Sequence, residues 1–404
     1  MDKNKLFFED LNKYNVVSIL KFLNKRKVLR TICKIKSYIM FSSYLYFKKY
    51  LTDFKGNQLY TLTGHEKSIK SLSFSPNGKY IVTGGADTYV IIWSTQTGEL
   101  VRKLYSYMRS IDSFTFSSNG DYLATISNKL TVFNPNNGEV VFKAKEDGEL
   151  VVSLAFSPDS NLFATGSYEG VVILWSIQKL NLLYKRTNHN DYVKCITFNN
   201  KGEYLASGSL DKTIIIWRTS NMECLFTLAD HKQRISSLCF SNLKNYLVSG
   251  SYDTDMIVWD IEKGKNIRKL TEHKDIVWTI INHPNPKNSK TKKEIFASAS
   301  FDKTIRLWEW DYEYDDDNKS KYIGNSIAIL EGHEKAVKCI GFSPNGDYLA
   351  SGSDDCMVII WSGENGKLLQ KLDGHTCRVE SLCFSYDGKL LATGSSDNLC
   401  IIWN

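Results

Sequence analysis

Short apolar runs alternate with turn sequences along most of the chain. Segments such as SLCF and IIIW are rich in β-branched and aromatic residues, and sequences such as SPNG and NKG separate them. Apolar runs of this length between turn residues are typical of strands, because an amphipathic helix needs a longer segment with apolar positions three and four residues apart. The pattern predicts about four short strands in every stretch of roughly 40 residues, and hence an all-β body.

The strand pattern repeats as a unit that ends on an aromatic residue. Successive closing residues are 40, 42, 42, 42, 49, 53 and 42 positions apart. They are Trp93, Phe133, Trp175, Trp217, Trp259, Trp308, Trp361 and Trp403. One unit is too small to bury both faces of its sheet, whereas eight sheets stacked radially cover one another. The eight units therefore predict a β-propeller of eight blades.

Six units also carry a His near their start, and in three of them a Gly precedes it. The first reads TLTGHEKSIKSLSFSPNGKYIVTGGADTYVIIW and the seventh reads LEGHEKAVKCIGFSPNGDYLASGSDDCMVIIW. This pattern resembles the WD-repeat (WD40) family, whose period is about 40 to 45 residues. The resemblance implies an eight-bladed WD-repeat β-propeller over residues 56–404. Because the chain stops at Asn404, directly after the last Trp, we expect residues 57–62 to supply the outer strand of blade eight and close the ring.

Six units repeat a set of His, Ser or Thr, Asp and Trp in the same order. The sets are His65, Thr83, Asp87 and Trp93; His189, Ser207, Asp211 and Trp217; His231, Ser249, Asp253 and Trp259; His273, Ser298, Asp302 and Trp308; His333, Ser351, Asp355 and Trp361; and His375, Thr393, Asp397 and Trp403. One such set alone could be interpreted as a hydrolase triad, but an enzyme does not need six. The family resemblance implies a structural hydrogen-bond network in each blade instead.

Blades two and three depart from this pattern. Tyr107 and Asp147 stand in the His position, Phe133 replaces the Trp of blade two, and Glu169 replaces the Asp of blade three. We expect these two blades to be the least stable part of the ring.

Charge divides the chain into two parts. Residues 1–55 carry 13 Lys/Arg against 4 Asp/Glu, a balance of +9, which leaves 38 against 40, or −2, for residues 56–404. A nucleic-acid-binding domain carries a basic patch on its own surface, so we expect no nucleic-acid partner for the body. No apolar run reaches the roughly 20 residues of a membrane span, and the acidic start is unlike a secretory signal. We expect no transmembrane segment, and a location in the cytoplasm or nucleus.

Motifs for cofactors and metals are absent from the sequence. It contains no GxxxxGKS/T loop, HExxH pair, EF-hand loop or GxSxG elbow, and its nine Cys form no CxxC pair. We therefore expect no cofactor, no metal site and no enzymatic activity.

Residues 1–55 form a basic module of a different character. Apolar residues recur in three groups, the first at Val16, Ile19, Leu20 and Leu23, and this spacing predicts short helices. The order ILKFLNKRKVL, TICK and YLYFKKYL resembles an F-box, a helical module that docks on an adaptor of cullin-type ubiquitin ligases. A helical cap on the propeller, a LisH-like dimerisation helix and a basic membrane-surface segment are alternatives.

The WD-repeat resemblance also implies where a partner binds. In the family, contacts recur on the narrow top face at the third and fifth residues after the histidine and at the residue before the turn Asp. Here those positions hold large apolar side chains in blades three to six, together with a few cations. The predicted partner site comprises Leu150, Val152, Tyr168, Tyr192, Lys194, Leu210, Arg234, Tyr252, Ile276, Trp278, Phe301 and Arg378. Exposed aromatic and Arg side chains are typical interface anchors, so we expect a protein or peptide here. Alternatively, several of them fill the central channel, or the cations receive a phosphate.

These features favour non-catalytic protein recognition. The more specific interpretation is a substrate receptor of a cullin-type ubiquitin ligase, with the adaptor on residues 1–55 and the target on the top face. The alternative is a WD-repeat structural or assembly scaffold with no ubiquitin role.

Unit six is longer than the others because of two charged insertions. These are INHPNPKNSKTKKE at 281–294 and EWDYEYDDDNKSKY at 309–322. Charge runs of this kind are more often solvated loops than sites, so we expect two loops on the bottom face.

Overall fold

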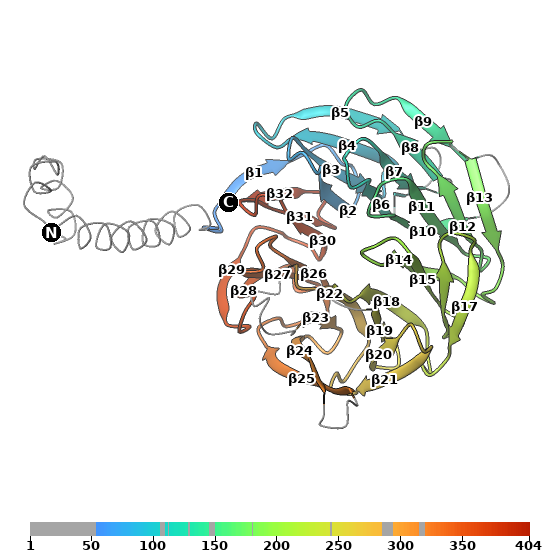
Figure 1. The fold of residues 1–404 in the computed structure, drawn as a ribbon. Helices are drawn as coiled ribbons and strands as arrows, with labels where there is room; N and C mark the ends of the chain where they lie inside the picture. Colours follow the sequence, from blue (N-terminus) through green and yellow to red (C-terminus); the bar gives the residue numbers. More distant parts are fainter. Residues whose placement is uncertain are drawn as a thin grey trace, which may run out of the picture. The chain divides into compact units, whose positions relative to one another are not determined.

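The computed structural model describes residues 54–105, 110–111, 113–127, 130–144, 150–179, 181–242, 245–284, 294–314 and 320–404. In this part of the chain, 32 strands form eight antiparallel four-stranded sheets, arranged as blades around a central axis (Figure 1). The described residues contain no helix. The prediction of an all-β, eight-bladed propeller is confirmed. The helical, F-box-like module predicted for residues 1–55 lies outside the described residues, apart from Phe54 and Lys55.

In the first four blades the strands follow one another from the inner edge of the sheet to the outer edge. Blade one contains β2 (Ile69–Phe74), β3 (Tyr80–Gly85), β4 (Tyr89–Ser94) and β5 (Leu100–Tyr105). Blade two contains β6 (Ser113–Phe116), β7 (Leu123–Ile126), β8 (Leu130–Phe133) and β9 (Val140–Lys143). Blade three contains β10 (Val151–Phe156), β11 (Leu162–Ser167), β12 (Val172–Ser176) and β13 (Asn181–Arg186). Blade four contains β14 (Val193–Phe198), β15 (Tyr204–Ser209), β16 (Ile214–Arg218) and β17 (Glu223–Leu228).

The other four blades have the same order, except that the last takes its outer strand from the start of the described chain. Blade five contains β18 (Ile235–Phe240), β19 (Tyr246–Ser251), β20 (Met256–Asp260) and β21 (Lys265–Leu270). Blade six contains β22 (Val277–Asn282), β23 (Glu294–Ser300), β24 (Ile305–Tyr314) and β25 (Ser320–Leu330). Blade seven contains β26 (Val337–Phe342), β27 (Tyr348–Ser353), β28 (Val358–Ser362) and β29 (Leu368–Leu372). Blade eight contains β30 (Val379–Phe384), β31 (Leu391–Ser395), β32 (Cys400–Trp403) and β1 (Gln58–Leu62).

The pairing of β1 with β32 joins the two ends of the described chain (Figure 1). Leu62 lies opposite Cys400, and the backbone N–H groups of Lys55 and Asn57 both donate to the carbonyl oxygen of Asn404, at 2.8 and 3.1 Å. The N–H of Asn404 donates back to the carbonyl oxygen of Asn57 at 2.9 Å. This pairing covers the outer edge of β32, which would otherwise be an open edge strand.

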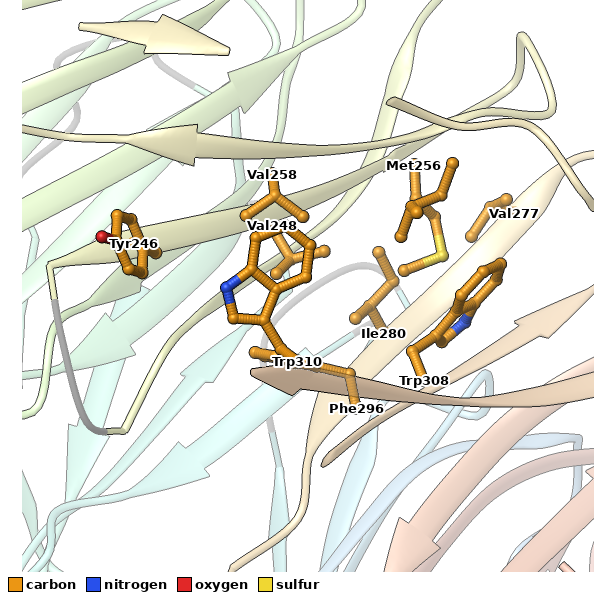
Figure 2. Close-up of a cluster of buried hydrophobic side chains, with 10 residues drawn as sticks. Tyr246, Val248, Met256, Val258, Val277, Ile280, Phe296, Trp308 and Trp310 are labelled. Carbon is orange, nitrogen blue, oxygen red and sulfur yellow. The ribbon is translucent and has the colours of Figure 1, made fainter. Parts of the chain in front are cut away.

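The hydrophobic core lies between neighbouring blades. One cluster combines apolar side chains of blades five and six, including Val248 and Val277 (Figure 2). Another joins blade one to blade eight, where Gly394 allows a close approach: a Cβ at that position would lie 2.7 Å from Ile69 Cγ2. Because successive side chains of a strand point to opposite faces, each sheet buries apolar residues against the blade on either side.

The expected loop at 309–322 is wrong for the residues that the structure describes. β24 is ten residues long and β25 is eleven, and they pair as a hairpin from Ile305 opposite Leu330 to Tyr314 opposite Ser320. Trp310 is 2% exposed and belongs to the core cluster between blades five and six (Figure 2). The sequence WDYEY alternates aromatic and acidic residues, and this period of two suits a strand although its charge favours a loop.

Candidate functional site

Each regular blade carries one chain of side-chain hydrogen bonds. In blade four, His189 Nδ1 lies 2.9 Å from Asp211 Oδ2, and His189 Nε2 lies 2.8 Å from Ser207 Oγ. The indole N–H of Trp217 donates to the same Ser207 oxygen at 2.9 Å. The structure brings together the four side chains of the other five sets in the same way.

The direction of these bonds leaves no free nucleophile. The indole can only donate, so the hydroxyl oxygen accepts from it, and the hydroxyl hydrogen goes to His Nε2, while Nδ1–H goes to the carboxylate. With a neutral imidazole, every polar side-chain atom in this series of hydrogen bonds thus has a partner. The Ser and Thr residues of all six sets are 0% exposed, so a substrate has no access to their hydroxyl groups. The sets contain the groups of a catalytic triad, but their position suits the stability of the blade.

The network determines the ionisation of its carboxyl groups. Burial by itself raises the pKa of Asp253, but the hydrogen bond from His231 and the backbone N–H of Lys232 outweigh burial and lower the pKa to about 2. In the same way, burial is outweighed by His and Thr hydrogen bonds at Asp211 and Asp302, and the pKa of each is lowered. These acids are ionised at neutral pH, as the proposed bond directions require.

In blades one and eight, which meet where the ring closes, the pKa of the network histidine is lowered. Burial lowers the pKa of His65 and of His375 below the ordinary value of 6.5, although Asp87 and Asp397 oppose the shift. Both imidazoles therefore take up a proton less readily in the folded chain than in the unfolded chain.

The described part of blade three contains half of the network. The indole N–H of Trp175 donates to Thr165 Oγ1 at 2.9 Å, as in the regular blades. Glu169, which replaces the turn Asp, is exposed. The residues in the His position of blades two and three, Tyr107 and Asp147, lie outside the described part of the chain.

The two groups of predicted top-face positions converge within each blade. The N–H of Tyr168 donates to the carbonyl oxygen of Leu150, and the N–H of Leu210 to that of Tyr192, both at 2.9 Å. Equivalent bonds at 3.0 Å join Tyr252 to Arg234, Phe301 to Ile276, and Ser396 to Arg378. These bonds connect the loop that enters each inner strand with the turn between the second and third strands, so both loops present one continuous edge.

Aromatic side chains on this face form two contacting groups. The rings of Tyr168 and Tyr192 meet edge to face with centroids 4.4 Å apart. In blades five and six, Trp278 stacks on Phe301 at 5.1 Å and lies 6.3 Å from Tyr252. Tyr168 is 53% exposed and the other four are half-buried. We call these five residues the aromatic crescent.

The remaining predicted residues are less uniform. The apolar side chains of Leu150, Val152, Leu210 and Ile276 are half-buried, whereas Arg234 is exposed. Because the four apolar side chains are half-buried, they add little exposed apolar surface to the aromatic crescent.

A pocket of about 210 Å³ lies beside the second aromatic group. Its lining comes from the inner strands of blades four to seven and comprises Lys194, Ser236, Ser237, Trp278, Thr279, Lys338, Cys339 and Ile340. Lys338 Nζ lies 4.1 Å from the ring centroid of Phe301 and 4.6 Å from that of Trp278. Lys194 Nζ lies 5.7 Å from the Trp278 centroid. Cation–π attraction favours both ammonium positions.

Sequence reasoning missed part of this pocket. Ser237, Thr279 and Cys339 each follow directly after the fifth residue from the histidine, one position beyond those that the family resemblance indicates. The available signal was a run of small residues at equivalent places in the inner strands. Burial raises the pKa of the Cys339 thiol, so this side chain adds no negative charge to the pocket at neutral pH.

On blades eight and one the cations are paired. Glu380 Oε1 accepts a hydrogen bond from Lys70 Nζ at 3.0 Å and lies 2.9 Å from Arg378 Nε. Arg378, a predicted partner residue, therefore belongs to an ion-pair group in another blade and is not part of the aromatic crescent. The structure does not unite all predicted site residues in one patch.

Comparison with known protein families shows which family the chain matches. Seven segments match the WD domain, G-beta repeat family: 56–94, 139–176, 180–218, 222–260, 264–309, 324–362 and 366–404. Together they cover more than half of the chain. It belongs to the WD-repeat family. The matched segments leave out most of blade two, the blade in which Phe133 replaces the closing Trp of a WD repeat.

Several WD-repeat relatives are similar over short stretches. The chain is 41% identical to a ribosome biogenesis protein WDR12 homolog of Anopheles gambiae over 70 residues, which are 17% of this chain and 15% of that protein. It is 39% identical over 71 residues to a probable cytosolic iron-sulfur protein assembly protein 1 of Kluyveromyces lactis, covering 17% of this chain and 21% of that protein. A component of chromatin assembly factor 1 from Gallus gallus is 36% identical over 74 residues, 18% of this chain and 12% of that protein. The chain thus spans about a fifth or less of these relatives.

The fold is also similar to that of a solved structure. The computationally designed Ika8 protein superposes with a TM-score of 0.72 and 26% identity, over 86% of this chain and 99% of the designed one.

Within the residues that the structure describes, no helix has the length and apolar character needed to cross a membrane. The described residues also include no group of three or more His, Cys, Asp or Glu side chains arranged to hold a metal ion.

Proposed function

We propose that this WD-repeat protein is a non-catalytic assembly scaffold that binds a peptide segment of a partner on the top face of blades three to six. The observation that carries the proposal is the aromatic crescent. Its five rings form two contacting groups, one in blades three and four and one in blades five and six, and keep part of their surface open to solvent. Clustered Tyr and Trp side chains supply large contact areas at low entropic cost, and they dominate many protein interfaces.

The names of the relatives support the class of function. They are a ribosome biogenesis protein, an iron-sulfur protein assembly protein and a component of a chromatin assembly factor. Because the similar stretches are short, they favour a scaffold in general and identify no partner. We expect this scaffold to act in the cytoplasm or nucleus.

The ubiquitin-ligase interpretation depends on residues 1–55 alone. It stays a prediction, and deletion of residues 1–53 tests it: a ligase receptor would lose its adaptor while retaining the top-face partner. A scaffold without a ubiquitin role would show no cullin-type adaptor in purifications of either form.

Substitution within the aromatic crescent tests the proposed scaffold. We expect Trp278→Ala and Tyr252→Ala each to weaken partner binding by about 2 kcal/mol, roughly 30-fold in Kd, because anchors of this type carry most of the binding energy. Quantitative affinity purification of the full chain from cells measures the loss. Tyr386→Ala is the matched control, since Tyr386 is 59% exposed on the turn between β30 and β31, at the opposite end of the inner strands. Unchanged partner recovery in both crescent variants contradicts the proposal.

A further inference from the structure

The pocket beside Trp278 presents hydrogen-bond donors. Two ammonium groups, those of Lys194 and Lys338, line it together with the hydroxyl groups of Ser237 and Thr279. Ser237 Oγ accepts the N–H of Ile280 at 3.0 Å, and its hydroxyl hydrogen has no acceptor among the described residues. A side chain entering this pocket therefore meets donors that are available to an acceptor group.

The charge of the pocket is incompletely balanced. Lys338 Nζ lies 3.8 Å from Asp354 Oδ2, whereas Lys194 has no carboxylate within 4.0 Å among the described residues. Two ammonium groups and one carboxylate leave an excess of one positive charge. At the equivalent position of blade one, Lys70 is paired directly with Glu380 at 3.0 Å. Of the three lysines, Lys194 is therefore the one with no carboxylate within 4.0 Å among the described residues.

The same geometry argues against a cationic ligand. The stacked rings of Trp278 and Phe301 form a surface that attracts cations, but Lys338 of the chain already occupies it. A lysine or arginine of a partner would have to displace this ammonium group and would meet Lys194 as well.

The size of the excess positive charge in the pocket favours a carboxylate over a phosphoryl group as its ligand. One carboxylate balances a single positive charge, whereas a phosphoryl group brings about −1.5 to −2. The pocket is also lined by lysines and contains no guanidinium group, the side chain best suited to bidentate phosphate recognition. Both observations favour an Asp or Glu side chain.

We propose that the pocket between Lys194 and Lys338 binds the carboxylate of an acidic residue in the partner peptide, next to apolar residues that contact the aromatic crescent. This inference rests on the proposed peptide-binding function and adds its specificity. The ammonium groups pair with the carboxylate, and the hydroxyl groups of Ser237 and Thr279 donate to its remaining lone pairs.

A random-peptide phage library, selected on the full-length chain, tests the proposal without a known partner. The best peptide is then synthesised with its acidic residue as Glu, Gln or phosphoserine, and its affinity is measured by fluorescence anisotropy. We expect the Glu peptide to bind about tenfold more tightly than the Gln peptide on the unchanged chain, a comparison that requires no variant.

Substitution of each lysine tests whether the preference for the Glu peptide arises in this pocket. Lys194→Met and Lys338→Met should each remove most of the preference for Glu over Gln, measured as the ratio of the two peptide affinities on the same variant. Lys70→Met is the matched control, because Lys70 occupies the same place in the repeat on another blade, and it should leave the preference unchanged. Urea unfolding of each variant verifies that it is folded.

The possible results separate this inference from the proposed function. Equal binding of the Glu and Gln peptides, or a preference that survives both lysine variants, overturns the acidic pocket and leaves peptide binding intact. Tighter binding of the phosphoserine peptide overturns the carboxylate assignment in favour of a phosphopeptide. A selection that enriches no peptide overturns both the pocket and the peptide-binding function.

Discussion

Leu62 in the closing strand offers a direct test of how the ring is held together. Its side chain is 2% exposed and packs in the cluster that joins blade one to blade eight, with Ile69 and Ile402 among its members. Leu62→Ala removes three carbon groups at about 0.8 kcal/mol each and leaves a cavity between two rigid sheets. We expect the free energy of unfolding to decrease by about 3 kcal/mol.

Leu59 in the same strand provides the matched control. It is 41% exposed, so Leu59→Ala should change the free energy of unfolding by no more than about 0.5 kcal/mol. Equilibrium unfolding in urea, followed by tryptophan fluorescence, measures both variants. Trp93 of the same cluster and Trp403 of the paired strand report on the closure itself. A loss below about 1 kcal/mol for Leu62→Ala, or equal losses for both variants, would refute the reasoning that β1 secures the ring.

Three further predictions concern the network and the core. The free energy of unfolding should fall as the pH decreases from about 7 to 5, because His65 and His375 have lower pKa values in the folded chain and the unfolded chain therefore binds protons more readily. Urea unfolding over this pH range measures the change, and a rise in stability would contradict the prediction. Ser207→Ala should cost about 2 to 3 kcal/mol by leaving the buried imidazole of His189 without a donor, and an unchanged urea midpoint would exclude a structural role. Trp310→Ala should cost about 3 to 5 kcal/mol, whereas a merely solvated insertion would show almost no change in the same assay.

The local repeat carried enough information to predict the blades and the position of their polar network. Strand length, turn residues and the alternation of side chains are properties of a few consecutive residues, and they recur eight times. The His189 set shows the limit of this information. Sequence indicated that four polar residues belong together, but only the structure shows that the Ser207 hydroxyl is fully buried and bonded on both sides, which separates a structural network from a triad.

In the hairpin of blade six, the charge of the sequence and its periodicity lead to different predictions. Aspartates and glutamates around Trp310 favoured a solvated loop, yet the strand pairing extends through Tyr314, and the Trp310 ring reaches the core between two blades. Whether an alternating segment extends a strand depends on the partner strand beside it, and the residue opposite Trp310 is Gly324 of the next strand.

The number of blades and their strands could be predicted from the sequence, because each repeat specifies its own strands and the repeats can be counted. The combination of side chains from different blades became visible only in three dimensions. The contact of Lys338 with Trp278 and Phe301, the pairing of Lys70 with Glu380, and the pocket lined by four inner strands all join residues from separate repeats. Such contacts depend on side-chain direction and on the packing of neighbouring sheets, which no single repeat specifies.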